Sequence, residues 1–166
     1  VNAGYWKEGS VKGSHKEYYT EVSHDPIKLG KNANLRFLGG YQRDYYGYND
    51  TIRSMPYWGA RFRSKVGSRA NVWVSYNQRN ISYNNSPYRF DTTELPKELI
   101  YGGSYKLTRL DDLSVSVKTN MMSGDIDSVY YTWHRDLHSF DMYLTYKDAH
   151  RSDNDQWKIK FVGKDF

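Results

Sequence analysis

The chain contains no cysteine, only 4 prolines among 166 residues, and no run of about 18 apolar residues. The last absence excludes a transmembrane helix, which needs an apolar stretch of about that length. The lack of cysteine fits the bacterial envelope without requiring it. No secretory leader is visible and the sequence begins on Val1, so we expect either a processed protein or a piece of a longer one.

Helical patterning is also missing, because no segment sustains apolar residues at the i, i+3, i+4, i+7 spacing with a cap. The mean hydropathy is −0.89, which makes a large water-soluble core hard to assemble. Aromatic residues nevertheless make up 17% of the chain, too many for a disordered protein. A membrane β-barrel reconciles these facts, since its apolar surface is a thin outward band with aromatic rims and its interior is polar.

Alternation of apolar and polar residues is the main signal, and it is clearest in Ser128–His134, Phe140–Lys147 and Gln156–Phe166. Successive side chains of a strand point to opposite sides of a sheet, so each segment is predicted to be a strand with one apolar face. The residues of that face are Val129, Tyr131, Trp133, Phe140, Met142, Leu144, Tyr146, Trp157, Ile159 and Phe161. A sheet this polar on its other face belongs to a sandwich or to the wall of a membrane barrel.

About ten alternating stretches recur along the whole chain. They lie near Asn2–Val11, Lys16–Ser23, Ala33–Gln42, Tyr57–Val66, Ala70–Arg79, Glu98–Leu107, Leu113–Asn120, Asp127–His134, Phe140–Lys147 and Gln156–Val162. We therefore predict an all-β antiparallel meander that forms a transmembrane β-barrel of about 8–10 strands or part of a larger barrel wall. Residues 1–166 are expected to be a single domain, and the start within a strand favours a fragment of a longer barrel.

The predicted connections alternate in length, as in outer-membrane barrels. Short ones are expected at Lys12–Ser14, Gly67–Ser68 and Leu110–Asp112, and long polar ones at Arg43–Pro56 and Asn80–Pro96. The glycine pairs Gly39–Gly40 and Gly102–Gly103 are expected to allow strand curvature or close packing. Five tryptophans, namely Trp6, Trp58, Trp73, Trp133 and Trp157, suit interfacial belts.

Basic residues fall on the parity opposite to the apolar one and would face a polar lumen. The candidates for contact with anionic sugar phosphates are Arg61, Arg63, Lys65, Lys106 and Lys118. The net charge of +5 also fits simple solvation of strand faces and loops. Nucleic acid is not an expected partner, because the basic residues alternate with apolar ones and form no compact run.

The string Tyr131–Phe140, followed by a closing strand, is the most specific motif. Its residues Trp133, Asp136, Leu137, His138, Ser139 and Phe140 resemble a hairpin near the C-terminal end of the lipopolysaccharide-assembly outer-membrane proteins, the organic-solvent-tolerance family known as LptD. Ser139 stands where that family often has a cysteine, so nothing that depends on a thiol carries over. The resemblance covers about thirty residues and leaves the rest of the chain with only a general barrel character.

The resemblance implies a non-catalytic role in moving lipopolysaccharide into the outer leaflet of the bacterial outer membrane. It also implies partners: outer-membrane lipids, a plug lipoprotein, periplasmic transport proteins and the barrel-assembly machinery. The final strand, with Trp157, Ile159, Phe161 and the terminal Phe166, would carry the assembly signal, although residues 161–165 do not match that signal cleanly.

The hairpin turn can also be interpreted from its residues alone. Asp136 is suited to open a tight turn by accepting a bond from its own backbone two residues on. Leu137 and His138 would then occupy the tip of the hairpin. We interpret the motif first as a register-setting turn and second as a substrate contact.

Catalytic and metal chemistry receive little support. His134 and His138 share parity with Asp136, but the turn between the two histidines breaks that parity and no further ligand has a recognisable spacing, so no metal or other cofactor is expected. His138 and Ser139 are adjacent and would point oppositely on a strand, which disfavours a hydrolase triad. The alternatives to the transport role are a small standalone barrel that modifies lipid A or acts as an adhesin, and a soluble β-sandwich binding module.

Overall fold

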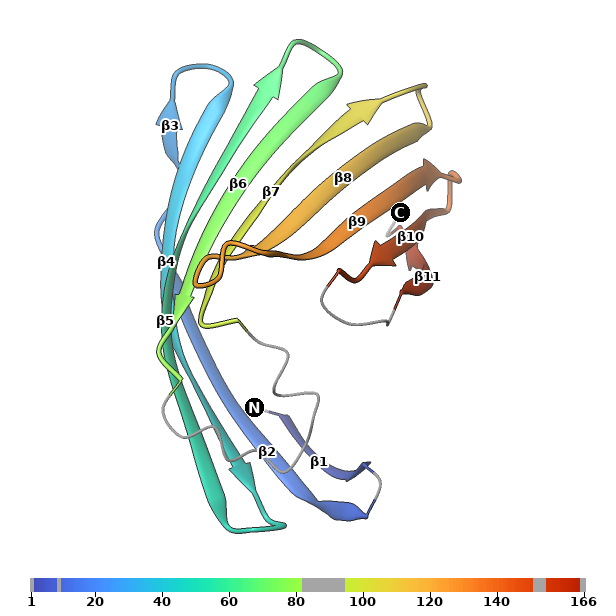
Figure 1. Ribbon diagram of the computed structural model, residues 1–166. Coiled ribbons are helices and arrows are strands. Elements are labelled where there is room, and N and C mark those ends of the chain that lie inside the picture. The colour runs from blue at the N-terminus through green and yellow to red at the C-terminus, as the bar shows by residue number, and fades with distance from the viewer. Residues whose placement is uncertain (1, 9, 82–94, 151–154, 165–166) are drawn as a thin grey trace. The chain divides into compact units, whose positions relative to one another are not determined.

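The computed structural model describes residues 2–8, 10–81, 95–150 and 155–164, and every regular element in these ranges is a β-strand (Figure 1). The strands are β1 (Asn2–Glu8), β2 (Val11–Ser23), β3 (Ile27–Leu29), β4 (Ala33–Tyr46), β5 (Thr51–Val66), β6 (Ala70–Arg79), β7 (Lys97–Lys106), β8 (Asp111–Asn120), β9 (Ile126–Asp136), β10 (Phe140–Asp148) and β11 (Gln156–Gly163). No helix in the described ranges has the length and hydropathy needed to cross a membrane.

One antiparallel sheet contains all of these strands, in the order β1-β2-β4-β5-β6-β7-β8-β9-β10-β11, with β3 paired to β4 beside this path. The predicted all-β meander is therefore confirmed. Within the described strands β1 and β11 are the two edges of the sheet, so closure into a barrel stays a prediction. The chain divides into two compact units: unit 1 comprises the described residues within 1–25, 36–60 and 77–97, and unit 2 those within 26–35, 61–76 and 98–166.

All ten predicted strands are present, and the turn at Gly67–Ser68 is confirmed. Four details are wrong. The short β3 was not predicted, Lys12–Ser14 lies inside β2, and the long loop expected at Arg43–Pro56 is largely strand, with a turn at residues 47–50. Strand β8 also starts at Asp111, so the turn before it covers residues 107–110. Most of the loop predicted at Asn80–Pro96 lies outside the described residues.

The register of unit 2 places the predicted apolar residues on one face. Leu113 of β8 pairs with Trp133, Trp133 with Leu144 of β10, and Leu144 with Ile159 of β11. The next row on the opposite face is polar and runs through Asp112, His134, Tyr143 and Lys160. Residues directly opposite each other across an antiparallel pair share a face, so the period-two reading of this region is confirmed.

Burial departs from the usual order, although some apolar side chains, such as Leu38, Tyr46 and Met55, are buried. Large apolar side chains are exposed along the sheet, among them Trp58 at 50%, Trp157 at 69% and Ile159 at 62%. A few charged side chains are instead buried, with Asp44 and Arg53 each 1% exposed and Glu98 4%. In a water-soluble domain the apolar face of a sheet is covered by another layer. The described strands form a single sheet rather than two packed ones, which argues against the β-sandwich alternative.

A cluster of buried polar side chains forms the interior of unit 1. Asp44 Oδ1 lies 3.2 Å from His15 Nε2, and Arg53 Nη1 lies 3.9 Å from Asp44 Oδ2. The His15 ring stacks on Tyr46 with 5.1 Å between the ring centroids. Gln42 Nε2 donates to both Asp44 oxygens at 3.2–3.3 Å. Because buried charges are costly unless paired, these partners are what permits Asp44 and Arg53 to face inward.

One glycine of each predicted pair lies under an aromatic ring on the polar face. The Tyr57 ring covers Gly40 in unit 1, and the Trp73 ring covers Gly102 in unit 2. The expected close packing at these glycines is thus confirmed, since a side chain there would collide with the ring. Trp73 consequently lies on the polar face, so it does not fit the expected interfacial belt, which would face lipid. The side chain of Trp6 lies outside the described part of the chain.

Candidate functional site

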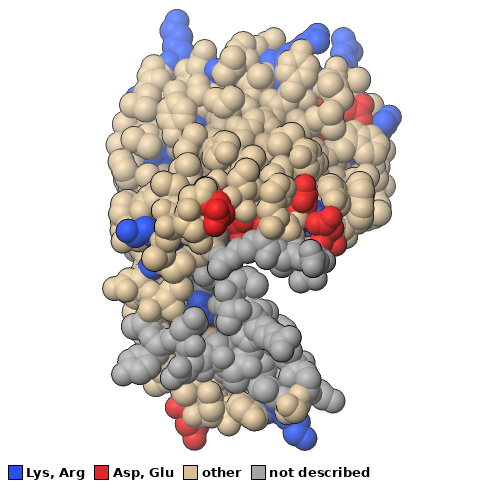
Figure 2. All heavy atoms as spheres, viewed as in Figure 1, with Lys and Arg blue, Asp and Glu red and all other residues tan. Residues whose placement is uncertain are grey.

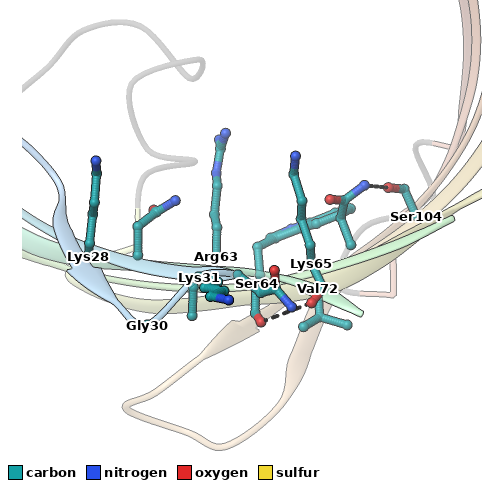
Figure 3. A pocket seen from close by; sticks show the side chains of 13 residues that line it. Lys28, Gly30, Lys31, Arg63, Ser64, Lys65, Val72 and Ser104 are labelled. Carbon is teal, nitrogen blue, oxygen red and sulfur yellow. Dashed lines mark hydrogen bonds between the residues drawn. The ribbon is translucent and has the colours of Figure 1, made fainter. Parts of the chain in front are cut away.

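A basic hollow on the polar face of unit 2 is the strongest candidate site (Figure 3). Its volume is about 870 Å³. The lining residues are Lys28, Gly30, Lys31, Asn32, Ala33, Asn34, Arg63, Ser64, Lys65, Asn71, Val72, Trp73 and Ser104. Among the described residues, the lining contains four cationic side chains and no carboxylate. Basic side chains also project from the upper edge of this unit in Figure 2.

Two strands and one turn bring these cations together. Lys28 comes from β3, whereas Arg63 and Lys65 alternate along β5 and therefore share a face. The backbone N–H of Lys65 donates to the Asn32 carbonyl at 2.8 Å, which ties the end of β5 to the turn that carries Lys31. Figure 3 shows Lys28, Arg63 and Lys65 projecting to the same side of the sheet as Ser104.

The positive charge of this hollow is not balanced by a carboxylate from the described ranges. Lys28, Lys31, Arg63 and Lys65 are all exposed, and none of them forms an ion pair with another described residue. Asn71 Nδ2 donates to Ser104 Oγ at 3.4 Å, which adds polar groups at the same side. A concave surface with several unpaired cations attracts anions, and oxygens of phosphate or carboxylate groups are the matching ligands.

The five predicted lumen cations do not form one group. Arg63 and Lys65 line the hollow, while Arg61 and Lys106 are exposed but lie outside its lining. Lys118 differs from the other four, because its Nζ lies 3.4 Å from Glu98 Oε2 and 3.8 Å from Asp127 Oδ2. Its charge is balanced by these two carboxylates. Lys28 and Lys31 were not among the predicted cations, and they lie in and after the unpredicted strand β3.

The hairpin turn within Tyr131–Phe140 has the predicted hydrogen bond from the backbone to Asp136. Asp136 Oδ1 accepts the backbone N–H of His138 at 2.9 Å, two residues on, so the predicted Asp-led turn is confirmed. His138 occupies the tip with φ of 66°, in the left-handed region. Lys164 Nζ lies 2.6 Å from the same Asp136 oxygen, and this carboxylate raises the pKa of Lys164. The residue after β11 is thereby tied to the end of β9.

His134 is held between two carboxylates on the polar face. Its Nε2 lies 2.8 Å from Asp141 Oδ1 and its Nδ1 lies 3.2 Å from Asp112 Oδ2. The ring also stacks on Tyr143 with 4.7 Å between centroids. Because both ring nitrogens are engaged, His134 braces β8, β9 and β10. No group of three or more His, Cys, Asp and Glu residues in the described ranges is arranged to hold a metal ion.

The motif residues Trp133 and Phe140 lie on the apolar face, and Leu137 lies in the turn between their strands. Trp133 Nε1 donates to Asp111 Oδ1 at 3.0 Å. Leu137 and Phe140 are each 36% exposed, and the Phe140 ring meets the Phe161 ring edge-on at 5.6 Å. Ser139 is a turn residue whose backbone N–H donates to the Leu137 carbonyl at 2.8 Å.

The predicted assembly-signal residues of β11 share one exposed face. Trp157, Ile159 and Phe161 are between 60% and 69% exposed and lie at alternate positions. The terminal Phe166 lies outside the described residues.

Comparison with known proteins gave no assignment: neither the family models nor the curated proteins that were searched include a match to this chain.

Proposed function

We propose that the chain forms the wall of a bacterial outer-membrane β-barrel, or part of one, that moves lipopolysaccharide toward the outer leaflet without catalysing a reaction. The observation that supports the membrane wall most is the reversed burial. Exposed Trp, Ile, Phe and Val side chains cover one face, and the opposite face buries Asp, Arg and Glu. Contact between the first face and lipid tails would carry no hydrophobic cost, whereas contact between that face and water would.

The strand lengths support the same proposal. A tilted strand needs about 9–11 residues to cross a bilayer. Strands β6, β7 and β8 have 10 residues each, and β4 and β5 are longer, at 14 and 16 residues. The sheet is an antiparallel meander with neighbouring strands joined in order, as in outer-membrane barrels.

The lipopolysaccharide part of the proposal has two supports. The residues from Trp133 to Phe140 resemble the hairpin of the lipopolysaccharide-assembly family. The basic hollow around Lys28, Arg63 and Lys65 lies on the polar face, where sugar phosphates would pass. The cations of the hollow would neutralise those phosphates transiently, while the acyl chains remain outside the lumen.

Bilayer insertion can be tested with single cysteines, because the chain has none of its own. The adjacent residues Ile159 and Lys160 face opposite sides of β11. After reconstitution into phospholipid vesicles, Lys160→Cys should react with a water-soluble maleimide, and Ile159→Cys should react far more slowly. Both should react in denaturant. Equal labelling of the two variants in vesicles would contradict a membrane wall.

The substrate can be tested by photo-crosslinking in Gram-negative cells that assemble the protein. A photoreactive residue in place of Arg63 or Lys65 should capture lipopolysaccharide, and one in place of Lys158 is the matched control outside the hollow. Capture at all three positions alike, or at none in an inserted barrel, would contradict the lipopolysaccharide role. Conversion of lipid A by the purified chain would favour the enzyme alternative instead.

A further inference from the structure

A second groove, in unit 1, lies on the apolar face rather than the polar one. Its volume is about 600 Å³, and its lining consists of Lys16, Tyr18, Tyr41, Arg43, Tyr45 and Ile52. Tyr18 pairs with Arg43 across β2 and β4, and Lys16 pairs with Tyr45. These cross-strand pairs alternate with the pairs His15–Tyr46 and Glu17–Asp44, which belong to the buried interior. The groove therefore faces outward.

The groove combines aromatic rings with two cations that have no anionic partner among the residues that the structure describes. Tyr18, Tyr41 and Ile52 are 48%, 44% and 41% exposed. Neither Lys16 nor Arg43 forms an ion pair with any residue in the described part of the chain, and both side chains are exposed. The phenol groups are positioned by hydrogen bonds, because Tyr41 donates to Ser54 Oγ at 3.0 Å and Tyr45 donates to Asp50 Oδ1 at 2.7 Å.

Farther from the turn at residues 47–50, beyond Thr20 and Ser54, the same face is mainly apolar. Val22, Phe37 and Trp58 have the parity of the groove residues on β2, β4 and β5, and they are 71%, 45% and 50% exposed. Cations and tyrosines near the strand ends, followed by aliphatic and aromatic side chains, match the order of a lipid headgroup and its chains. A soluble anion would make no contact with the apolar surface beyond the groove.

We propose that this groove binds the phosphate-bearing headgroup of an anionic membrane lipid, with Lys16 and Arg43 contacting the phosphate and the three tyrosines packing around the rest of the headgroup. The inference rests on the proposed function, since it needs the outward face to meet a bilayer. It assigns a lipid site on the outside of the wall, separate from the basic hollow on the polar face.

The test uses the full chain in a non-ionic detergent and measures binding of short-chain phosphatidic acid by native mass spectrometry. The double variant Lys16→Gln/Arg43→Gln should weaken this binding by at least about tenfold, since two charge-assisted contacts are lost. The matched control Lys158→Gln/Lys160→Gln removes the same charge from the polar face and should leave binding unchanged. The exchange Lys16→Arg/Arg43→Lys should retain most of the affinity, which excludes misfolding as the cause of the loss.

Two further ligands identify the source of the phosphate. A diacylglycerol with the same chains should bind poorly, and inorganic phosphate should not compete at equal concentration. Equal binding by the glutamine variant and the parent, or competition by inorganic phosphate, would overturn the lipid site. If the cysteine pair at 159 and 160 reports an inserted wall while the glutamine variant binds normally, only this inference fails and the proposed function stands.

Discussion

The phenol ring of Tyr57 covers the backbone of Gly40, so that a β-carbon built on this glycine would lie 2.5 Å from Tyr57 Cζ. The same β-carbon would collide with the Thr20 carbonyl oxygen on the neighbouring strand. Gly40→Ala should therefore lower the free energy of unfolding by about 1–3 kcal/mol, the usual cost of an overpacked site. Urea titration of the refolded chain in detergent measures this change.

The adjacent glycine supplies the control. A β-carbon on Gly39 would meet its nearest atom, the Tyr57 carbonyl oxygen, at an ordinary 3.6 Å. Gly39→Ala should be neutral or slightly stabilising, because alanine restricts the unfolded chain more than glycine does. Equal losses at the two positions would show that the Tyr57 ring does not require Gly40.

Asp44 should be essential to the interior of unit 1. Asp44→Leu removes the carboxylate that lies 3.2 Å from His15 and 3.9 Å from Arg53, while the Arg53 charge stays buried. Breaking a buried ion pair from one side costs about 3–5 kcal/mol, and a loss of that order is expected in urea unfolding. Asp25→Ala, at an exposed site in the same unit, should change stability by less than about 0.5 kcal/mol. A loss below about 1 kcal/mol for Asp44→Leu would contradict a role for this carboxylate in the interior.

The predicted lumen cations should separate into two kinds. Lys118→Gln removes the ammonium that Glu98 and Asp127 share, so it should lower the free energy of unfolding by about 1–3 kcal/mol with little effect on binding of an anionic glycolipid. Arg63→Gln/Lys65→Gln should do the opposite, weakening binding with little loss of stability, because both side chains are exposed. Glycolipid titration and urea unfolding of the same samples measure both effects. If both variants changed stability and glycolipid binding in the same way, ion pairing would not distinguish Lys118 from Arg63 and Lys65.

Asp155 should give the connection before β11 an acid sensitivity. It accepts the Ala149 backbone N–H at 2.9 Å and the Tyr146 hydroxyl at 2.8 Å, and these donors lower the pKa of Asp155. A lowered pKa in the folded state means that the carboxylate stabilises the fold fully above its unfolded pKa of about 3.9, and that this contribution is lost as the pH falls through the folded value. Protection of the Ala149 amide against hydrogen exchange, corrected for the intrinsic rate, should therefore hold at pH 5 and decline only below about pH 4.

Asp155→Asn is the control for this prediction. An amide can still accept from Ala149 but does not titrate, so protection at residue 149 should be lower than in the parent and independent of pH between 2 and 6. An unchanged acid transition in this variant would assign the titration to another group.

The strands could be predicted from the sequence because the period-two pattern survives wherever one face is apolar. It fails where both faces carry polar residues. The end of β4 and the start of β5 resemble a loop in sequence, because Asp44 and Arg53 stand at inward positions, where Asp44 pairs with Arg53 and also contacts His15 and Gln42. That pairing joins residues nine apart and cannot be recognised from local alternation.

The candidate site was predictable in part for the same reason. Parity alone places Arg63 and Lys65 together on the polar face. Lys28 and Lys31 come from a hairpin whose first strand has three residues, too short for alternation to be measured. The neutralisation of Lys118 depends on Glu98 and Asp127 in two other strands, so its separation from the remaining cations could not be derived from its own segment.

The reversed burial changes how sequence variation in this chain should be interpreted. In most proteins a surface position accepts a carboxylate readily. If the outward face meets lipid tails, an acidic substitution at Val115 or Ile159 would hinder insertion, whereas the same substitution at Ser114 or Lys160 would be tolerated. The apolar positions that are most exposed in the isolated chain would then be the positions that tolerate an acidic substitution least.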